Sequence, residues 1–210
     1  MNNIITLNPT SAQIIENDDY IQYSIKAITS GILIETSKDE IHKSKLKLET
    51  YEEYLKLDIK DILKEKNWIY NIIDHKAEQK SIIFEDDNII IIPDYKWNNN
   101  INELHVLGIF KDKSLRSIRD LNSTHIKILK ETIQIGCSII NKKYDVKLDN
   151  ILTFFHYHPS TWQLHIHFMN INDQKTRSCI LPRAYLCSTV IQNLELIPDY
   201  YKKIKLEVYD

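Results

Sequence analysis

The stretch that most constrains this chain is residues 154–169, which read FFHYHPSTWQLHIHFM. Its second half alternates polar and apolar side chains, and this alternation is typical of a β-strand whose two faces meet different surroundings. A strand over residues 163–170 would carry two sets of side chains on opposite faces: Gln163, His165, His167 and Met169 on one, and Leu164, Ile166 and Phe168 on the other. We therefore predict that the apolar face packs on a core and that the imidazole face looks into a cavity.

The first half of the same stretch predicts a second strand, residues 152–158, with His156 and His158 two residues apart. The segment Pro159 to Trp162 is short enough to turn the chain back, so the two strands should pair antiparallel. The expected result is a single patch that holds all the histidines of the hairpin: His156, His158, His165 and His167.

The composition excludes several classes of protein. A net charge of −2 gives no bulk basic character for binding long nucleic acid or an anionic membrane. Only three glycines occur in 210 residues, which argues against a P-loop or a dinucleotide-binding glycine loop.

Cysteine usage and the apolar runs predict where the protein is found. The three cysteines, Cys137, Cys179 and Cys187, are odd in number and form no CxxC pair, which favours a reduced compartment. The chain begins without a secretory signal pattern, and no apolar run is long enough to span a bilayer. We expect a cytoplasmic protein, with the nucleus as a second location, and no membrane partner.

The order of the elements predicts an α+β domain. An amphipathic helix from residue 58 toward Glu78 carries Trp68, and a hairpin over residues 81–92 and a strand over residues 104–110 follow. Helices are expected from an N-cap at Ser123 and over residues 184–195. The sum is an antiparallel sheet of about five strands with flanking helices in residues 57–210, preceded by a small strand-and-helix module in residues 1–56.

A row of imidazoles suits nucleophilic attack on phosphorus, because neutral imidazole is a nucleophile and its protonated neighbours stabilise negative charge. Two other interpretations remain open. The histidines could be satisfied core residues, or they could bind zinc, for which such ligands and spacings are known. Against zinc, the hairpin contains no carboxylate and no thiolate.

Several blocks of the sequence resemble one known family. QLHIHF at residues 163–168 resembles the histidine-triad signature, and HYHPSTWQLHIHF resembles the corresponding stretch of the scavenger mRNA-decapping enzymes. The resemblance continues, in order, in four further blocks: WIYNIIDHKAE at 68–78, IIPDYKWN at 91–98, LRSIRDL at 115–121 and RAYLCSTVIQNLE at 183–195. It implies a histidine-triad fold over roughly residues 58–210.

The resemblance also implies a reaction. His165 matches the family's nucleophile, which attacks the phosphorus next to 7-methylguanosine and forms a nucleotidyl-histidine that water releases. The positions that match phosphate-binding or phosphate-polarising residues are His167, His156, Ser160 and Arg183. Such an enzyme needs no metal and no other cofactor. Its expected substrates are the cap dinucleotide and short capped RNA, and its product is 7-methylguanosine monophosphate.

The resemblance places a cap pocket on the residues around Trp68. An indole face attracts the positively charged 7-methylguanine by stacking and cation–π interaction, and Tyr95 could close the stack from the other side. Glu78 matches the carboxylate that accepts hydrogen bonds from the guanine edge. Asp94 and Lys96 match positions that contact ribose and phosphate. Without the resemblance, Trp68 reads as a core residue and Glu78 as a solvated helix end.

The chain departs from the family pattern in three places. Gln163 occupies the first triad position, where histidine is usual, Thr161 stands where an aromatic residue is usual, and only about 56 residues precede the matching region. We still expect a homodimer, since histidine-triad folds commonly pair through their sheets. Two alternatives stay open: a general histidine-triad hydrolase of dinucleoside polyphosphates or nucleotide conjugates, and a cap-binding module with weak turnover.

Overall fold

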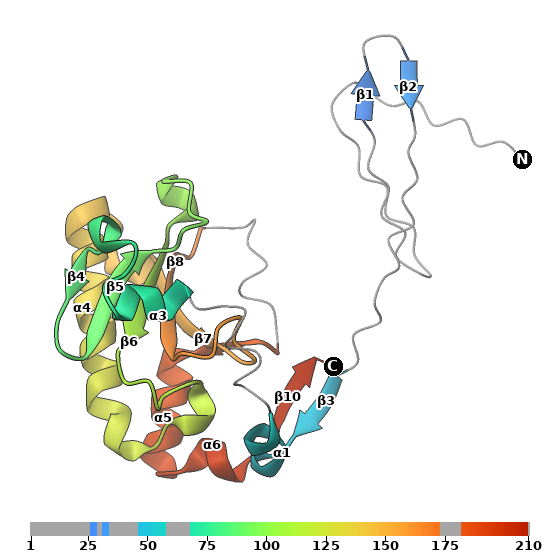
Figure 1. Cartoon of the computed structure of the whole chain (residues 1–210), viewed down its shortest axis with the longest axis vertical. Helices are drawn as coiled ribbons and strands as arrows, with labels where there is room; N and C mark the ends of the chain where they lie inside the picture. Colours follow the sequence, from blue (N-terminus) through green and yellow to red (C-terminus); the bar gives the residue numbers. More distant parts are fainter. Residues whose placement is uncertain (1–25, 29–30, 34–45, 58–67, 173–181, 210) are drawn as a thin grey trace, which may run out of the picture. The chain divides into compact units, whose positions relative to one another are not determined.

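The computed structural model describes residues 26–28, 31–33, 46–57, 68–172 and 182–209. Contacts divide the chain into two compact units, Met1–Lys45 and Leu46–Asp210. In the first unit, β1 (Lys26–Ile28) pairs antiparallel with β2 (Gly31–Leu33). The second unit holds all the other described elements, and the site is built on it (Figure 1).

The centre of the second unit is a six-stranded sheet with the strand order β4-β5-β6-β8-β7-β9. Every neighbouring pair in it is antiparallel. The strands are β4 (Phe84–Glu85), β5 (Ile89–Pro93), β6 (His105–Phe110), β7 (Ile151–His156), β8 (His165–Asn170) and β9 (Ala184–Leu186). The predicted α+β class is confirmed. The sixth strand, β9, consists of residues that the sequence had suggested would begin a helix.

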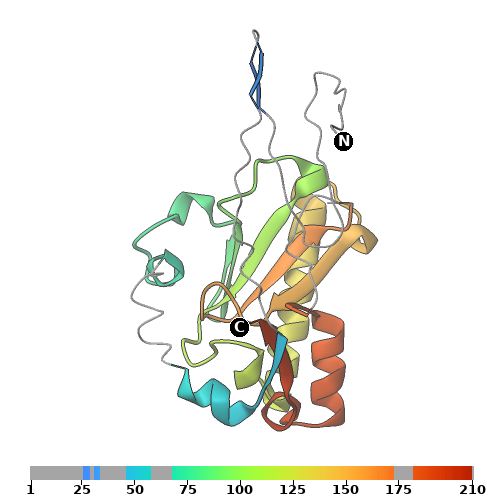
Figure 2. The same cartoon turned by 90° about the vertical axis from the view of Figure 1, so that its right-hand side faces the viewer.

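Helices cover both faces of this sheet. The α-helices are α1 (Tyr51–Lys56), α3 (Trp68–Ile73), α4 (Ile126–Tyr144), α5 (Cys187–Leu196) and α6 (Tyr200–Lys203). The short 3₁₀ helices are η1 (Gln79–Ser81), η2 (Ile101–Glu103), η3 (Ile118–Asp120), η4 (Ser123–His125) and η5 (Leu148–Asn150). Figure 2 shows α3 (teal) on one side of the sheet and α4 (yellow) with α5 (red) on the other. None of the helices in the described ranges is long and apolar enough to cross a membrane.

The alternation along each strand sorts the side chains into two cores. Ile166 and Phe168 of β8 join the larger core with α4 and α5, as the apolar face was expected to do. Leu107 and Ile109 of β6 belong to a smaller core on the opposite face, which α3 covers. His165 and His167 alternate with Ile166 and Phe168, so they project from the α3 side of the sheet.

Two further predicted helix boundaries were wrong. The helix that carries Trp68 ends at Ile73 and does not continue to Glu78, because the next N–H groups bond back to the last turn, among them that of Lys76 to the Asn71 carbonyl at 2.7 Å. Residues 58–67 lie outside the described ranges. Ser123 is not the N-cap of α4, which begins at Ile126 after His125; it is the first residue of η4. The N-cap of η4 is Asn122, whose side chain accepts from the Thr124 N–H at 2.9 Å.

The strand β3 (Leu46–Glu49) explains why the large unit begins before the boundary predicted at residue 56. It pairs antiparallel with β10 (Leu206–Tyr209), so the two ends of the unit form a two-stranded ribbon. Thr50 then caps α1 through a capping box with Glu53, whose N–H donates to the Thr50 hydroxyl at 3.2 Å. This ribbon brings Glu49 next to the histidine hairpin.

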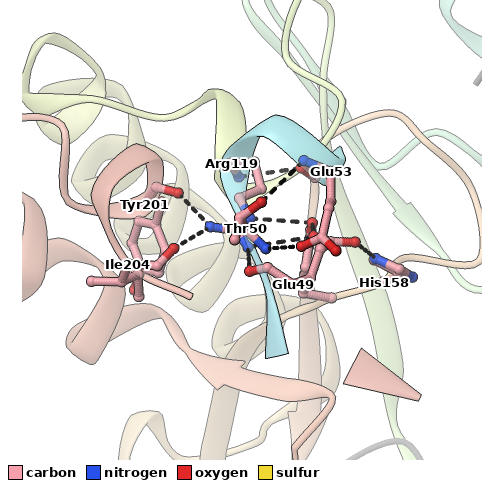
Figure 3. Close-up of polar contacts among 9 residues, drawn as sticks. Glu49, Thr50, Glu53, Arg119, His158, Tyr201 and Ile204 are labelled. Carbon is pink, nitrogen blue, oxygen red and sulfur yellow. Dashed lines mark hydrogen bonds and ion pairs between the residues drawn. The ribbon is translucent and has the colours of Figure 1, made fainter. Parts of the chain in front are cut away.

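A buried ion-pair network holds the ribbon against the hairpin (Figure 3). Arg119 is 0% exposed and donates to the backbone oxygen of Glu49 at 2.6 Å and to the carbonyls of Tyr201 and Ile204 at 2.8 Å each. The carboxylate of Glu49 accepts from the Tyr157 hydroxyl and from His158 Nε2. Segments distant in sequence therefore meet at one buried carboxylate.

Candidate active site

Three histidines of the predicted patch lie together. His165 and His167 are on β8, and His156 ends β7, which pairs with β8. The ring centroids of His156 and His167 are 4.2 Å apart, and those of His165 and His167 are 4.9 Å apart. The three residues are only 5–8% exposed. The structure thus confirms that the hairpin concentrates imidazoles, here on the sheet face that α3 covers.

The fourth histidine of the hairpin, His158, does not join this patch, so that expectation was wrong. Strand β7 ends at His156, and the alternation of faces stops with it. The His158 ring instead donates from Nε2 to Glu49 at 2.7 Å and lies 5.3 Å from the Trp162 ring. The buried carboxylate of Glu49 supplies the reason, because it requires hydrogen-bond donors.

The proton of His165 is fixed by its surroundings. Its Nδ1 lies 2.7 Å from the carbonyl oxygen of Gln163, and a carbonyl oxygen can only accept, so Nδ1 carries the proton. Burial lowers the pKa of His165 below its ordinary value and outweighs the opposing effects of this hydrogen bond and of the Asp94 charge. A neutral ring with its proton on Nδ1 has its lone pair on Nε2, which is the form a nucleophile requires.

His167 is buried among the other imidazoles. Burial holds the pKa of His167 well below its ordinary value, and the neighbouring imidazoles of His165, His156 and His105 lower it further. The His167 ring stacks on the Phe154 ring, with centroids 5.0 Å apart and planes 9° apart. Its Nε2 is buried and has no hydrogen-bond partner among the described residues. An orphaned polar atom of this kind at a cluster of imidazoles marks a place for a ligand group.

Sequence reasoning missed His105, the first residue of β6. His105 Nε2 lies 2.8 Å from His167 Nδ1, and His105 Nδ1 lies 3.8 Å from Asp94 Oδ2. The available signal was weak: one histidine at the start of an apolar strand, on the face that Leu107 and Ile109 continue. Only the pairing of β6 with β8 brings it to the site.

Arg183 lies beside the end of β7 that carries His156, just before the edge strand β9. It precedes β9 and donates from Nε to the carbonyl oxygen of His158 at 3.1 Å, while its own carbonyl accepts from the Tyr157 N–H at 2.9 Å. Burial lowers the pKa of the Arg183 guanidinium, and its positive charge contributes to the lowered pKa of both His165 and His167. Ser160, in the turn after His158, is exposed.

The expected cap-binding aromatics also meet. The rings of Trp68 and Tyr95 have centroids 5.9 Å apart and planes 62° apart, so they meet edge to face. Trp68 donates from its indole N–H to the Thr161 hydroxyl at 3.2 Å, which ties α3 to the histidine hairpin. Tyr95 is 71% exposed, and the Lys96 ammonium lies 5.4 Å from the centre of its ring.

Asp94 and Glu78 occupy different surroundings. Asp94 faces His105, and its other carboxylate oxygen accepts from the Lys96 N–H at 2.8 Å. Glu78 is exposed, adopts a left-handed φ of 59° and accepts from the Ser81 hydroxyl at 3.1 Å. Glu78 thus belongs to the turn after α3 and is available to solvent on that side.

Three further residues have structural roles. Gln163 is 0% exposed, and its amide nitrogen donates to the carbonyls of Phe110 and Asp112 at 2.7 and 2.9 Å. Trp97 packs edge-on against the Tyr144 ring, and Trp162 is buried in the larger core. Among the residues with a described structure, no group of three or more His, Cys, Asp or Glu is arranged to hold a metal ion.

In an antiparallel sheet, β8 presents the buried His165 and His167 at alternate positions, as the histidine-triad signature at residues 163–168 implies, and the fold is that of a histidine-triad protein. Residues 67–179 match the family model described as "Scavenger mRNA decapping enzyme C-term binding". The chain belongs to the scavenger mRNA decapping enzyme family.

Curated relatives support this assignment. The m7GpppX diphosphatase of Ascaris suum is 32% identical over 221 residues, which cover 96% of this chain and 73% of the relative. That of Rattus norvegicus is 31% identical and matches 95% of this chain and 65% of its own length. That of Caenorhabditis elegans is 38% identical over 145 residues. The chain thus spans less than two thirds of the rat relative and 46% of the nematode C. elegans relative.

Among solved structures, the crystal structure of the aprataxin ortholog Hnt3 in complex with DNA is similar to this chain. The TM-score is 0.46 with 17% sequence identity, and the match covers 59% of this chain and 72% of that one.

Proposed function

We propose that this protein hydrolyses the triphosphate bridge of the 7-methylguanosine cap in cap dinucleotide or short capped RNA. The observation that carries the proposal is the hydrogen bond between His165 Nδ1 and the Gln163 carbonyl oxygen. It leaves the lone pair of this neutral, buried imidazole on Nε2. The curated relatives named m7GpppX diphosphatase support the substrate class.

In the proposed reaction, His165 Nε2 attacks the phosphorus next to 7-methylguanosine. A P–N bond forms, and the P–O bond to the leaving nucleoside diphosphate breaks with its electron pair on the departing oxygen. Water then attacks the same phosphorus, the P–N bond breaks, and 7-methylguanosine monophosphate leaves. His156 and Arg183 flank this position and stabilise the charge on the phosphate oxygens, His167 lies next to the nucleophile, and we assign Ser160 a phosphate contact from the turn.

The base is proposed to bind between Trp68 and Tyr95. The two rings now meet edge to face, so a flat purine enters by turning one ring, and the exposed Tyr95 is the ring free to turn. The positive charge of 7-methylguanine favours this aromatic pair. We assign Glu78 to the guanine edge, Asp94 to the ribose and Lys96 to the phosphates.

The test is incubation with methylated cap dinucleotide, unmethylated cap dinucleotide and diadenosine tetraphosphate, with His165→Asn as the blank and chromatography of the products. We expect 7-methylguanosine monophosphate from the methylated cap alone, and none from the variant. Equal cleavage of all three substrates would identify a general histidine-triad hydrolase. Binding of the methylated cap without any product would identify a cap-binding module.

We further propose a homodimer. The β3–β10 ribbon exposes Leu46, Leu48 and Tyr209, and the register places Leu46 directly opposite Tyr209. Apolar side chains gathered on one face of a ribbon favour association with another surface. Light scattering should return about twice the chain mass of 24.9 kDa, and a value near 24.9 kDa would refute the dimer.

We also propose that the protein works in the cytoplasm, with the nucleus as a second location. Cys137 and Cys187 are free thiols, which suits a reduced compartment. Imaging of the tagged full chain tests this, and exclusive accumulation in a secretory compartment would contradict it.

A further inference from the structure

A hydrogen bond joins the rings of His105 and His167. The separation of 2.8 Å between His105 Nε2 and His167 Nδ1 is that of a hydrogen bond, and two imidazole nitrogens at this distance need one donor and one acceptor. The two rings come from adjacent strands, β6 and β8, with centroids 5.1 Å apart. Which ring donates decides what His167 presents to a substrate.

The surroundings of His105 decide the direction of this bond. Asp94 Oδ2 lies 3.8 Å from His105 Nδ1, within ion-pair range, and the negative carboxylate favours a proton on that nitrogen. A neutral His105 with its proton on Nδ1 has a bare Nε2, which must accept. His167 then donates from Nδ1, and its own Nε2 carries a lone pair.

An added positive charge is disfavoured in the free protein. Positive charge on any of four neighbouring side chains disfavours protonation of His167. These side chains are His165, His156, His105 and Arg183. The neutral chain of hydrogen bonds is therefore the stable arrangement before substrate binds. His167 Nε2, buried and without a partner among the described residues, is the end of that chain.

We propose that His105, held by Asp94, is a positioning residue that keeps the proton of His167 on Nδ1 and so makes His167 Nε2 the proton acceptor for hydrolysis of the nucleotidyl-His165 intermediate. This rests on the proposed function. When water attacks the phosphorus, its proton passes to His167 Nε2, the new P–O bond forms, and the P–N bond breaks with its electron pair on His165 Nε2. The imidazolium of His167 is then stabilised through His105 by the Asp94 charge.

The test uses His105→Phe, which keeps a ring but cannot accept a hydrogen bond, and His105→Gln, whose amide oxygen can. General bases contribute about 10²–10⁴-fold to rate, and loss of orientation alone should lower kcat by about 10- to 100-fold in His105→Phe. Only hydrolysis of the nucleotidyl-His165 intermediate is slowed, so KM should fall in parallel with kcat. The ratio kcat/KM should then stay within about 3-fold of wild type. The nucleotidyl-protein should accumulate and be visible by intact mass, and His105→Gln should restore most of kcat.

A second readout does not depend on activity. Long-range ¹H–¹⁵N NMR of histidine-labelled wild-type protein should show His167 protonated on Nδ1, and His105→Phe should shift it toward the Nε2 tautomer. A wild-type His167 protonated on Nε2, or an unchanged kcat in a folded His105→Phe, would overturn the proposal. If the wild type cleaves no capped substrate, the proposed function fails, while the NMR spectrum still decides the tautomer.

Discussion

The Nε2 atom of His158 lies 2.7 Å from the Oε2 atom of Glu49, which joins the histidine hairpin to the strand that begins the large unit. Glu49 also accepts from Tyr157 and pairs with Arg119 at 3.4 Å, and both members of that ion pair are almost fully buried. Through the His158 carbonyl, the same segment holds the guanidinium of Arg183. The Glu49 carboxylate lies outside the candidate active site, but it therefore holds the His158 backbone that positions Arg183.

Removing the charge of Glu49 should destabilise the fold. Glu49→Gln keeps the shape of the side chain but leaves Arg119 as a buried charge without its counter-ion, which costs about 3–5 kcal/mol of unfolding free energy. Urea denaturation measures it. The matched control is Glu195→Gln at the exposed Lys130–Glu195 pair, where we expect less than about 1 kcal/mol. Equal losses in the two variants would contradict the assigned role of Glu49.

The same carboxylate should make stability depend on acid pH. Burial raises the pKa of Glu49, but the hydrogen bonds from His158 and Tyr157 and the charges of His158 and Arg119 outweigh burial, so the pKa lies below the ordinary 4.5. The contribution of the Glu49 charge to the free energy of unfolding is therefore fully present above about pH 4.5. It is lost as the pH falls through the lower pKa of Glu49 in the folded protein. Urea denaturation between pH 7 and 3 should show the unfolding free energies of the wild type and of Glu49→Gln converging as the pH falls below about 4.5. Parallel curves would argue against it.

Gly136 of α4 should not tolerate a side chain. A Cβ atom at this position would lie 2.4 Å from Cζ of the buried Phe168 ring, because α4 packs directly on β8 there. Alanine favours a helix over glycine by about 1 kcal/mol, but overpacking costs about 1–3 kcal/mol. We expect Gly136→Ala to lower the melting temperature. Ser138→Ala, on the exposed side of the same helix, should leave it unchanged or higher.

Restoring histidine at the first triad position should matter less than losing the nucleophile. The side chain of Gln163 reaches the Phe110 and Asp112 carbonyls, while it is the backbone oxygen of Gln163 that orients His165. We expect Gln163→His to change kcat by less than about 10-fold, within the range of an indirect effect, and His165→Asn to abolish turnover. Steady-state kinetics on the cap dinucleotide checks this, and comparable losses would refute it.

Trp68 should select the methylated base. Stacking of a base on an aromatic ring is worth about 1–3 kcal/mol, so Trp68→Ala should weaken methylated-cap binding about 5- to 150-fold. The unmethylated cap lacks the cation–π contribution and should lose less. Calorimetric titration measures this when Trp68→Ala is combined with His165→Asn, which removes turnover, and is compared with His165→Asn alone. Trp97→Phe is the control, because Trp97 packs on Tyr144, and a similar loss there would point to a general structural effect.

The alternation in residues 163–170 was enough to predict which face of β8 is apolar and which carries His165 and His167. A period of two is a local property of an extended chain, and Ile166 and Phe168 are buried in the core as predicted. The family resemblance likewise rests on local motifs, so it was available before any contact was known. The helix limits did not follow from the same pattern, because a turn such as the one after Ile73 depends on backbone hydrogen bonds that no periodicity reveals.

Local patterns in the sequence were sufficient to predict the row of histidines, its strand and the α+β class. The other groups that contact this row depend on the three-dimensional fold: His105 reaches it through the pairing of β6 with β8, and His158 instead bonds to Glu49. Neither follows from spacing, because each contact joins residues more than 60 positions apart. A buried polar group needs a partner, and the fold alone determines which distant strand supplies it.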